Sequence, residues 1–390
     1  MAELLINGND VSPDLLTFAQ ELVRLRSFSG QEEKVARAIA ARMKKLGYDQ
    51  VIIDRFGNIL GRLGNTGPSL MFESHTDTVQ VYDGDHWEEP PFSGTIRNSF
   101  LWGRGSVDMK SAIAASVYAP RIAKDLGWLE NRTVYVSCSV FEEDCDGEGV
   151  KHMMQECRIK PDFAVICEPS ANNITNGHKG KAQIIIRTNG VSAHGSAPEK
   201  GVNAVYEMAE IIQRVEQINL GLMQKAGHRG SLVLSHISST GVSLNAVPSD
   251  CEIYLDRRLA LGETQQTVLE EINRITSGKN AEWKFDTIHR TTWTGEPITY
   301  QPLHLAWKIS SDHPLTLAAV KAFRDTVGVS PRKFEFWDFS TNAVALVSQG
   351  IPCIGFGPGD PKLAHMRNER CAVDQIINAC AFYTALIGNI

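Results

Sequence analysis

The stretch "SLMFESHTDTV", residues 69–79, places a short apolar run directly before a histidine and an aspartate that lie two residues apart. The run from Leu70 to Phe72 predicts a short buried strand. Residues two apart on an extended segment point to the same side, roughly 6–7 Å from each other along the chain. His75 and Asp77 are therefore predicted to reach into one site at the end of this strand.

Helical and strand-forming segments alternate on either side of this stretch. A long helix is expected over residues 110–126, and the β-branched "TVYVSCSVFEE" of residues 133–143 predicts another strand. Near the C-terminus, the strand-forming "IPCIGF" of residues 351–356 precedes a closing helix. This alternation predicts an α/β layer whose central sheet is mostly parallel.

The pattern changes between residues 180 and 290. The order there is strand, helix, strand, strand, helix, strand, with helices expected near 202–217 and 263–278. This βαββαβ order is that of the ferredoxin-like unit. A chain of 390 residues is also too long for one ordinary domain. We therefore expect a catalytic domain of residues 1–179 and 291–390, with residues 180–290 inserted as a second domain.

The composition excludes several classes of protein. The net charge of -6, with both signs mixed along the chain, argues against nucleic acid or an anionic membrane as the main partner. No apolar stretch is long enough to span a bilayer, and "MAELLINGND" lacks the basic and apolar regions of a secretion signal. The 8 cysteines form no C-x-x-C pair, so we expect reduced, mostly buried thiols in a cytoplasmic protein.

Further acids and a second histidine follow other predicted strands or open a helix. Because the carboxyl ends of parallel strands meet at one edge of a sheet, these side chains should gather with His75. Taken singly, each is explained as a solvated loop residue or a helix cap, but their coincidence is hard to explain in that way. They are Asp108 in "GRGSVDMK", Glu142 and Glu143 in "VFEEDCDGEG", Glu168 in "VICEPS" and His365 in "KLAHMRNE".

These residue types favour a metal site. Two histidines with several carboxylates and no cysteine suit catalytic zinc, with manganese or cobalt as alternatives. More ligands than one ion needs predict a two-metal centre with a bridging carboxylate. The sequence has no G-x-S-x-G elbow and no P-loop. A thiol enzyme using Cys145 or Cys167 lacks a suitably placed Cys–His motif, so both cysteines are better explained as small buried residues.

Several motifs are shared with a known family. They are "SHTDTV", "GRGSVDMK", "EEDCDGEG", "CEPS", "SAHGSAPEKGVNA", "NAVPSDCEIYLDRR" and a late "GPG" followed by a histidine. From about residue 14 to 390, the chain resembles the two-zinc metallopeptidase family of carboxypeptidase G, acetylornithine deacetylase and succinyl-diaminopimelate desuccinylase. More narrowly, "DRRLALGET", "WDFSTN" and "GIPCIGFGPG" are similar to the YgeY-type hydrolases, a branch labelled as linked to selenium metabolism.

The resemblance implies a zinc-peptidase-like catalytic domain with an inserted dimerisation or lid domain. It also implies two divalent metal ions, with zinc as the first choice. His75 and Glu168 would hold one ion, and Glu143 and His365 would hold the other. Asp108 would bridge the two ions.

The same resemblance implies roles for neighbouring residues. Asp77 would orient His75, and a cis peptide would join Asp108 to Met109. Glu142 would be the general base, taking a proton from the attacking water and passing it to the leaving amine. Adjacent glutamates can do different jobs because neighbouring side chains on an extended segment diverge.

The inserted domain supplies a second set of implied residues. His194, which by its sequence context alone is a turn histidine, matches a family histidine that crosses a dimer interface to stabilise the oxyanion in the partner's site. Asn245 and Arg258 match the family's substrate-binding pair, and Arg258 would hold a substrate carboxylate through two hydrogen bonds. Arg257 alternates to the other face of its strand and is expected to be structural. The other residues expected to line the substrate pocket are Ser340, Thr341, Asn342 and Gly357.

The sequence therefore predicts a homodimeric metal-dependent amidohydrolase. Its substrate would be a small amide with a carboxylate, as for an N-acyl amino acid deacylase or a carboxypeptidase. Glu168, rather than aspartate, at the first metal is the choice that accompanies these activities in the family. The alternatives are a dipeptidase or aminopeptidase of the same family and an inactive dimeric binding protein, which would be expected to have lost ligands or the base.

Overall fold

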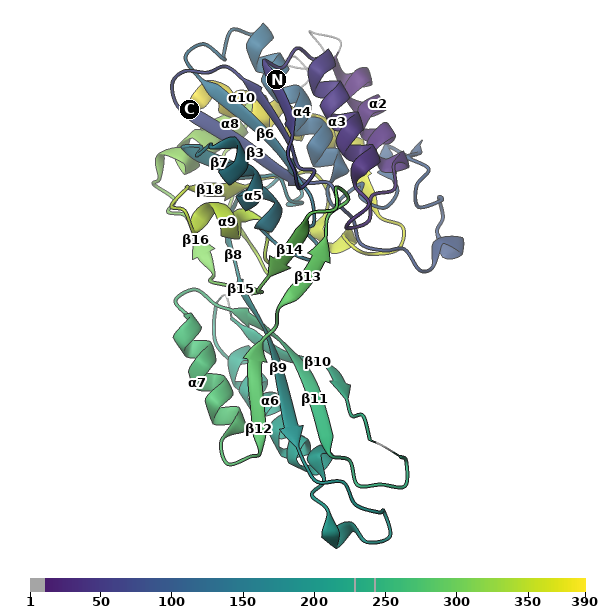
Figure 1. Ribbon diagram of the computed structural model, residues 1–390. Helices are drawn as coiled ribbons and strands as arrows, with labels where there is room; N and C mark the ends of the chain where they lie inside the picture. The colour runs from purple at the N-terminus through teal and green to yellow at the C-terminus, as the bar shows by residue number, and fades with distance from the viewer. Residues whose placement is uncertain (1–10, 228, 242) are drawn as a thin grey trace.

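The computed structural model describes residues 11–227, 229–241 and 243–390. The first ten residues, for which no secretion signal is predicted, lie outside the described residues. Figure 1 shows a larger unit built around one sheet and a smaller unit built around another. The predicted α/β class with an inserted βαββαβ unit is confirmed. The predicted domain boundaries at residues 180 and 290 stay a prediction.

The central sheet of the larger unit is parallel in its middle and antiparallel at its sides. Its strands are β1 (Gln50–Ile53), β2 (Ile59–Leu63), β3 (Ser69–His75), β6 (Thr133–Ser139), β7 (Phe163–Ile166), β8 (Thr175–His178), β16 (Trp307–Lys308), β17 (Glu335–Trp337) and β18 (Cys353–Gly355). Strands β6, β3, β7 and β18 lie side by side and run parallel. Their carboxyl ends therefore meet at one edge, as the sequence predicts.

Helices cover both faces of this sheet. They are α2 (Val11–Arg24), α3 (Glu33–Lys45), α4 (Lys110–Asp125), α5 (Glu148–Cys157), α8 (Pro314–Val327), α9 (Ala343–Val347) and α10 (Val373–Asn389). On β3, Phe72 contacts Tyr383 of α10, with ring centroids 4.9 Å apart, whereas Glu73 accepts a hydrogen bond from Asn342 at the start of α9. Because neighbouring side chains of a strand point to opposite faces, α10 and α9 lie on opposite sides of the sheet. Strand β3 is accordingly buried along almost its whole length.

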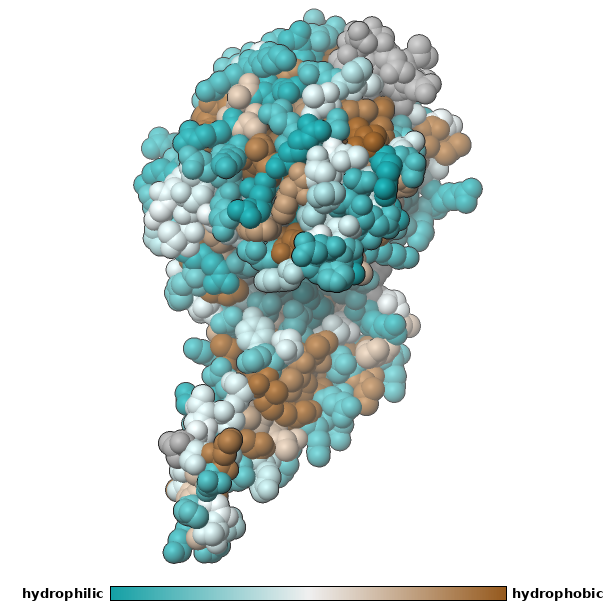
Figure 2. Space-filling model, turned by 90° about the vertical axis from the view of Figure 1, so that its right-hand side faces the viewer, coloured by the Kyte–Doolittle hydropathy of each residue, from teal (hydrophilic) through white to brown (hydrophobic). Residues whose placement is uncertain are grey.

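The smaller unit is an antiparallel sheet with one covered face. Its strands are β9 (Gly180–Asn189), β10 (Ser231–Ser238), β11 (Asp250–Leu259) and β12 (Ala281–Phe285), and its helices are α6 (Ala204–Met223) and α7 (Gln265–Thr276). Burial alternates residue by residue along β9 and β11, as expected for a sheet that faces helices on one side only. Figure 2 shows hydrophobic residues gathered on one exposed side of this unit.

Two antiparallel passages link the central sheet directly to the smaller sheet, and the chain also passes between the units before and after the hairpin of residues 288–300. Strand β8 ends at His178 and β9 begins at Gly180, so Lys179 alone separates a strand of the central sheet from a strand of the smaller sheet. The returning chain pairs β15 (Leu303–His304) with β9, and then β16 with β8. Two small sheets complete the larger unit. They are β4 (Ile96–Arg97), β5 (Phe100–Trp102) and β19 (Arg370–Ala372), and the hairpin of β13 (Ile288–Thr291) and β14 (Pro297–Tyr300).

No helix in the described ranges combines the length and apolar character needed to cross a membrane.

Arg257 of β11 holds the smaller unit together through buried ion pairs. Its Nε lies 2.8 Å from Oε2 of Glu271, and its Nη2 lies 2.9 Å from Oε1 of Glu263. The Arg257 side chain is 0% exposed, and both partners are mostly buried. One buried guanidinium therefore pairs with both carboxylates, and the exposed Lys225 lies 3.7 Å from Oε1 of Glu263 as well.

We expect Arg257→Ala to destabilise the smaller unit by about 3–5 kcal/mol, because it leaves the mostly buried Glu271 without its cation and Glu263 with the more distant Lys225. Thermal unfolding followed by circular dichroism measures the effect. Arg187→Ala removes an exposed arginine from β9 and serves as the control. Equal melting temperatures for the two variants would contradict the structural role of Arg257.

Candidate metal centre and substrate pocket

The predicted metal ligands gather at the carboxyl edge of the central sheet. Each comes from a different segment: His75 ends β3, Asp108 precedes α4, Glu143 follows β6, Glu168 follows β7, and His365 lies in the loop after β18. The shared edge follows from the parallel order of β6, β3, β7 and β18, since parallel strands end on the same side.

Asp108 lies between the two histidines. Its Oδ1 is 2.9 Å from Nε2 of His75, and its Oδ2 is 3.2 Å from Nε2 of His365. His365 Nε2 is also 3.0 Å from Oε2 of Glu143, and His75 Nε2 is 3.7 Å from Oε1 of Glu168. The Asp108–Met109 peptide bond is cis, as the family resemblance implies. A carboxylate between two imidazoles is in the place that a bridging ligand needs.

Asp77 ties three segments together beneath these ligands. Its Oδ1 is 3.4 Å from Nδ1 of His75 and accepts a hydrogen bond of 3.0 Å from the backbone N–H of Glu142. Its Oδ2 accepts hydrogen bonds from the backbone N–H of Glu143 at 3.2 Å and from the Ser29 hydroxyl at 2.7 Å. One buried carboxylate thus contacts the His75 ring and fixes the backbone of both adjacent glutamates.

The site buries more negative charge than its histidines can balance. Burial raises the pKa of Glu142 and of Glu168 well above the usual value, and neighbouring carboxylates act in the same direction. Burial acts against ionisation of Asp108 as well, but hydrogen bonds from His365 and His75 hold its pKa below the usual value. Hydrogen bonds to Asp108 and Glu143 raise the pKa of His365 to about 10. Additional positive charge would stabilise this group of acids.

The donor atoms fit divalent metal ions. One group consists of His75, Asp108 and Glu143, and a second consists of His75, Glu142 and Glu168; within each group the ligand atoms lie within 4.8 Å of one another. Nitrogen and oxygen donors without thiolates suit zinc, manganese or cobalt. Glu142, the predicted base, belongs to the second group and lines the pocket.

Two residues that support the site were not predicted. Glu369 accepts hydrogen bonds at its Oε1 from the backbone N–H groups of Val107, at 2.8 Å, and of Asp108, at 3.1 Å. Its Oε2 lies 2.5 Å from Nη1 of Arg104, and Nη2 of Arg104 donates to the backbone carbonyl of His365 at 3.2 Å. This buried pair fixes both the Asp108 segment and the His365 loop. Its only sequence signal is that both residues lie inside quoted motifs.

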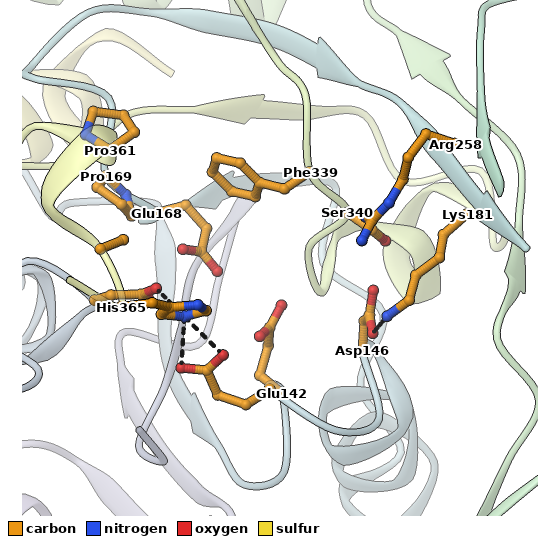
Figure 3. Close-up of a pocket in the computed structure, with 13 residues that line it drawn as sticks. Glu142, Asp146, Glu168, Pro169, Lys181, Arg258, Phe339, Ser340, Pro361 and His365 are labelled. Atoms are coloured by element: carbon orange, nitrogen blue, oxygen red, sulfur yellow. Dashed lines mark hydrogen bonds and ion pairs between the residues drawn. The ribbon is translucent and has the colours of Figure 1, made fainter. Parts of the chain in front are cut away.

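A cavity of about 290 Å³ opens beside the predicted ligands. Figure 3 shows Glu142, Glu168 and His365 on one side of it and Arg258 and Lys181 on the other. Arg258 and Ser340, two of the predicted substrate-binding residues, line it. Asp146 and Lys181 also line it and were not predicted.

Three other residues predicted to line the pocket lie beneath its wall. The Thr341 hydroxyl accepts a hydrogen bond from the backbone N–H of Ala343, at 3.2 Å. Asn342 donates to Glu73 and accepts from the backbone N–H of Gly147, and both Thr341 and Asn342 are buried. Gly357 packs against the backbone of Cys167 and Glu168, where a Cβ atom would come within 2.4 Å of their carbonyl oxygens. Direct contact of these three residues with a substrate stays a prediction.

His194 and Asn245 lie together on the smaller unit, outside the cavity lining. The backbone N–H of Gly195 donates to the Asn245 carbonyl at 2.7 Å, and His194 forms an isolated bridge with Ala246. Both predicted residues are exposed, and Nδ1 of His194 accepts a hydrogen bond from the backbone N–H of Ser196 at 3.1 Å. A single chain therefore does not bring them to the acidic edge.

Comparison with known proteins gives consistent matches. The family model for "Peptidase family M20/M25/M40" matches residues 71–389. The uncharacterized protein YgeY of Escherichia coli strain K12 is 35% identical over 389 residues, covering 98% of this chain and 96% of that protein. Acetylornithine deacetylase of Vibrio campbellii is 27% identical over 385 residues, covering 93% and 95%. A solved M20 family metallo-carboxypeptidase from Sulfolobus solfataricus shares the fold, with a TM-score of 0.74, 16% identity and coverage of 96% and 98%.

We expect Glu369→Gln to weaken zinc binding by about 10–100-fold, because the buried partner of Arg104 loses its charge and Asp108 loses support. Competition with a chromophoric zinc chelator measures the affinity. Glu270→Gln removes an exposed acid of α7 in the smaller unit, where it accepts a hydrogen bond from Gln266, and serves as the control. Unchanged zinc affinity in folded Glu369→Gln protein would show that Asp108 is held without Glu369.

Proposed function

Because the chain belongs to the peptidase family M20/M25/M40, as the motifs predict, we propose that it is a two-metal amidohydrolase acting on a small amide that carries a carboxylate. Metal-dependent hydrolysis of an amide is the activity that the family and its deacylase relatives indicate. The narrower choice, an N-acyl amino acid deacylase or carboxypeptidase-like enzyme, rests on one observation. The pocket places cationic side chains opposite the acidic edge.

We assign the metal ligands as the resemblance implies. His75 and Glu168 would hold one ion, Glu143 and His365 would hold the other, and Asp108 would bridge them. Bound divalent ions would make a water molecule more acidic and polarise the amide carbonyl. The distances from Asp108 to both histidines support this assignment.

Glu142 is the proposed general base. Its backbone is fixed by Asp77, and its side chain lines the pocket beside His75 and Glu168. Burial raises the pKa of Glu142 above the usual value. It would take a proton from the attacking water and pass it to the leaving amine.

The opposite end of the pocket favours an acidic substrate over a free amine. Arg258 would hold the substrate carboxylate there. A dipeptidase or aminopeptidase would instead need an acid for the substrate amine. Among the described residues that line the cavity, Asp146 is the acid that does not belong to the metal edge. Its carboxylate already pairs with Lys181. This pairing makes the peptidase alternative the weaker one.

We propose that His194 acts in the site of a second protomer, together with Asn245. Both are exposed in one chain, and several hydrophobic side chains near them or on the edge strand β10 are exposed as well. These are Val191, Val202, Tyr206, Val233, Ile237 and Leu244. An exposed group of this kind is typical of a surface that contacts another protein. A homodimer through the smaller unit would cover it and bring His194 to the partner's oxyanion.

We expect Glu142→Ala to lower kcat by about 10²–10⁴-fold while keeping fold and metal content, because the base is lost and the predicted ligands remain. Primary-amine release from a pool of N-acyl amino acids and dipeptides measures the activity, with chelated protein as the metal-free control. Asp144→Ala changes an acid of the same loop that pairs with Arg290 instead, and it should leave activity unchanged. Full turnover by Glu142→Ala would remove Glu142 as the base. Lack of release by fully metal-loaded wild-type protein would favour the binding-protein alternative.

We expect His194→Ala to abolish most activity without lowering metal content. Mixing it with an equal amount of Glu142→Ala protomers should restore about a quarter of wild-type activity. Half of the dimers are then mixed, and each mixed dimer has one complete site out of two. Mass spectrometry of differently tagged chains establishes that subunits have exchanged. If mixed dimers form and stay inactive, His194 does not act across the interface.

A further inference from the structure

Two cations from neighbouring strands enter the same end of the pocket. Lys181 of β9 is the direct cross-strand partner of Arg258 of β11. Residues directly opposite each other in an antiparallel pair project to the same face. Both side chains line the cavity, and Figure 3 shows them directed into it from the side opposite Glu168 and His365.

Each cation has its own carboxylate. Nε and Nη2 of Arg258 lie 2.7 Å and 3.1 Å from the two carboxylate oxygens of Asp256. Nζ of Lys181 lies 2.9 Å from Oδ1 of Asp146. Like charges directly opposite each other destabilise a sheet, and these two acids offset that repulsion. The described contacts leave Nη1 of Arg258 and two of the three Nζ hydrogens of Lys181 for another acceptor.

A chain of hydrogen bonds holds Asp146 in place. The Tyr300 hydroxyl donates to Oδ1 of Asp146 at 2.9 Å, and its oxygen lies 2.9 Å from Nε2 of His304. Burial lowers the pKa of His304 to about 4, so its ring is neutral at pH 7 and carries one N–H. Because the Tyr300 proton is given to Asp146, that N–H is the donor to Tyr300. Asp146 is buried, and the Lys181 side chain is 11% exposed, so the ammonium is held in position before a ligand arrives.

We propose that Lys181 is a specificity-determining residue that forms, with Arg258, one anion subsite for the substrate carboxylate. This inference rests on the proposed function and narrows its substrate class to amides whose carboxylate lies opposite the metal edge. A neutral group at this end would offer no charged acceptor to Nη1 of Arg258 or to the two remaining Nζ hydrogens of Lys181, and a free amine would meet only these donors. Asp146, which is itself held by the Tyr300 hydroxyl, positions Lys181.

Binding of simple diacids tests the subsite without using turnover. Zinc-loaded protein is titrated by calorimetry with straight-chain dicarboxylates from succinate to adipate and with the monomethyl ester of each. One carboxylate of a diacid can lie at the metal edge while the other lies between Lys181 and Arg258, and the ester lacks one of these charges. We expect wild-type protein to bind the best diacid at least about tenfold more tightly than its ester, and Lys181→Met to reduce that preference by about tenfold.

Three further variants separate charge from stability. The double variant Lys181→Met with Asp146→Asn avoids an unpaired buried carboxylate and should lose the preference equally. Lys181→Arg should retain most of the preference. Lys284→Met removes an exposed lysine of β12 and should bind as the wild type does.

The outcomes distinguish this inference from the proposed function. Wild-type protein that binds diacids and esters equally, or folded Lys181→Met protein that keeps the full preference, would overturn the subsite. If the wild-type protein hydrolyses amides and Lys181→Met keeps the preference for diacids, the proposed function stands and Lys181 is not part of the subsite. If Lys181→Met loses the preference for diacids but the wild-type protein hydrolyses no amide, the subsite is supported and the proposed reaction is not.

Discussion

Carboxylates buried together at one edge of a sheet repel one another, and hydrogen bonds from neighbouring segments of the larger unit stabilise several of them. Asp77 is stabilised by two backbone N–H groups and a hydroxyl, and Glu369 by two backbone N–H groups and Arg104. Each of these acids in turn fixes the backbone of a proposed ligand or base. Burial still raises the pKa of Glu369 to about 7, and it raises the pKa values of Glu142 and Glu168 well above the usual value. Bound divalent cations would reduce the repulsion between these carboxylates and would thereby favour their ionised form.

The parallel strands make this concentration of charge possible. Because strands β6, β3, β7 and β18 are parallel, residues as far apart in the chain as His75 and His365 lie at one edge of the sheet. Because apolar runs and the residues that follow them are visible in a sequence, the strand order did not have to be known to predict His75, Glu143, Glu168 and His365 together. The order of strands and helices in the sequence likewise distinguished the smaller sheet from the central sheet. Burial alternates along β9 and β11, whereas it is continuous along β3.

Residues that act through pairing could not be predicted in this way. Arg104 and Glu369 are far apart in the chain, and their contact depends on the pairing of β5 with β19, which brings the final loop back beside Arg104. Lys181 meets Arg258 only because β9 and β11 pair in one register, and a shift by one residue would turn one of them to the other face. Thr341 and Asn342 show the opposite limit. Their motif was visible, but a motif does not reveal that both side chains are buried and hydrogen-bonded inside the protein. The exposure of His194 likewise leaves its partner to be sought in another chain.

The crossing at Lys179 has a geometrical consequence for ligand length. The acidic edge belongs to the central sheet, whereas Lys181 and Arg258 belong to the smaller sheet, and short antiparallel passages from β8 to β9 and from β15 to β16 join the two sheets directly. The distance between the opposite charges of the pocket is consequently a property of the bend at this junction. A small rotation of one sheet against the other would change that distance while leaving each cluster intact. Related chains with identical charged residues could therefore select amides of different length through the backbone at this junction alone.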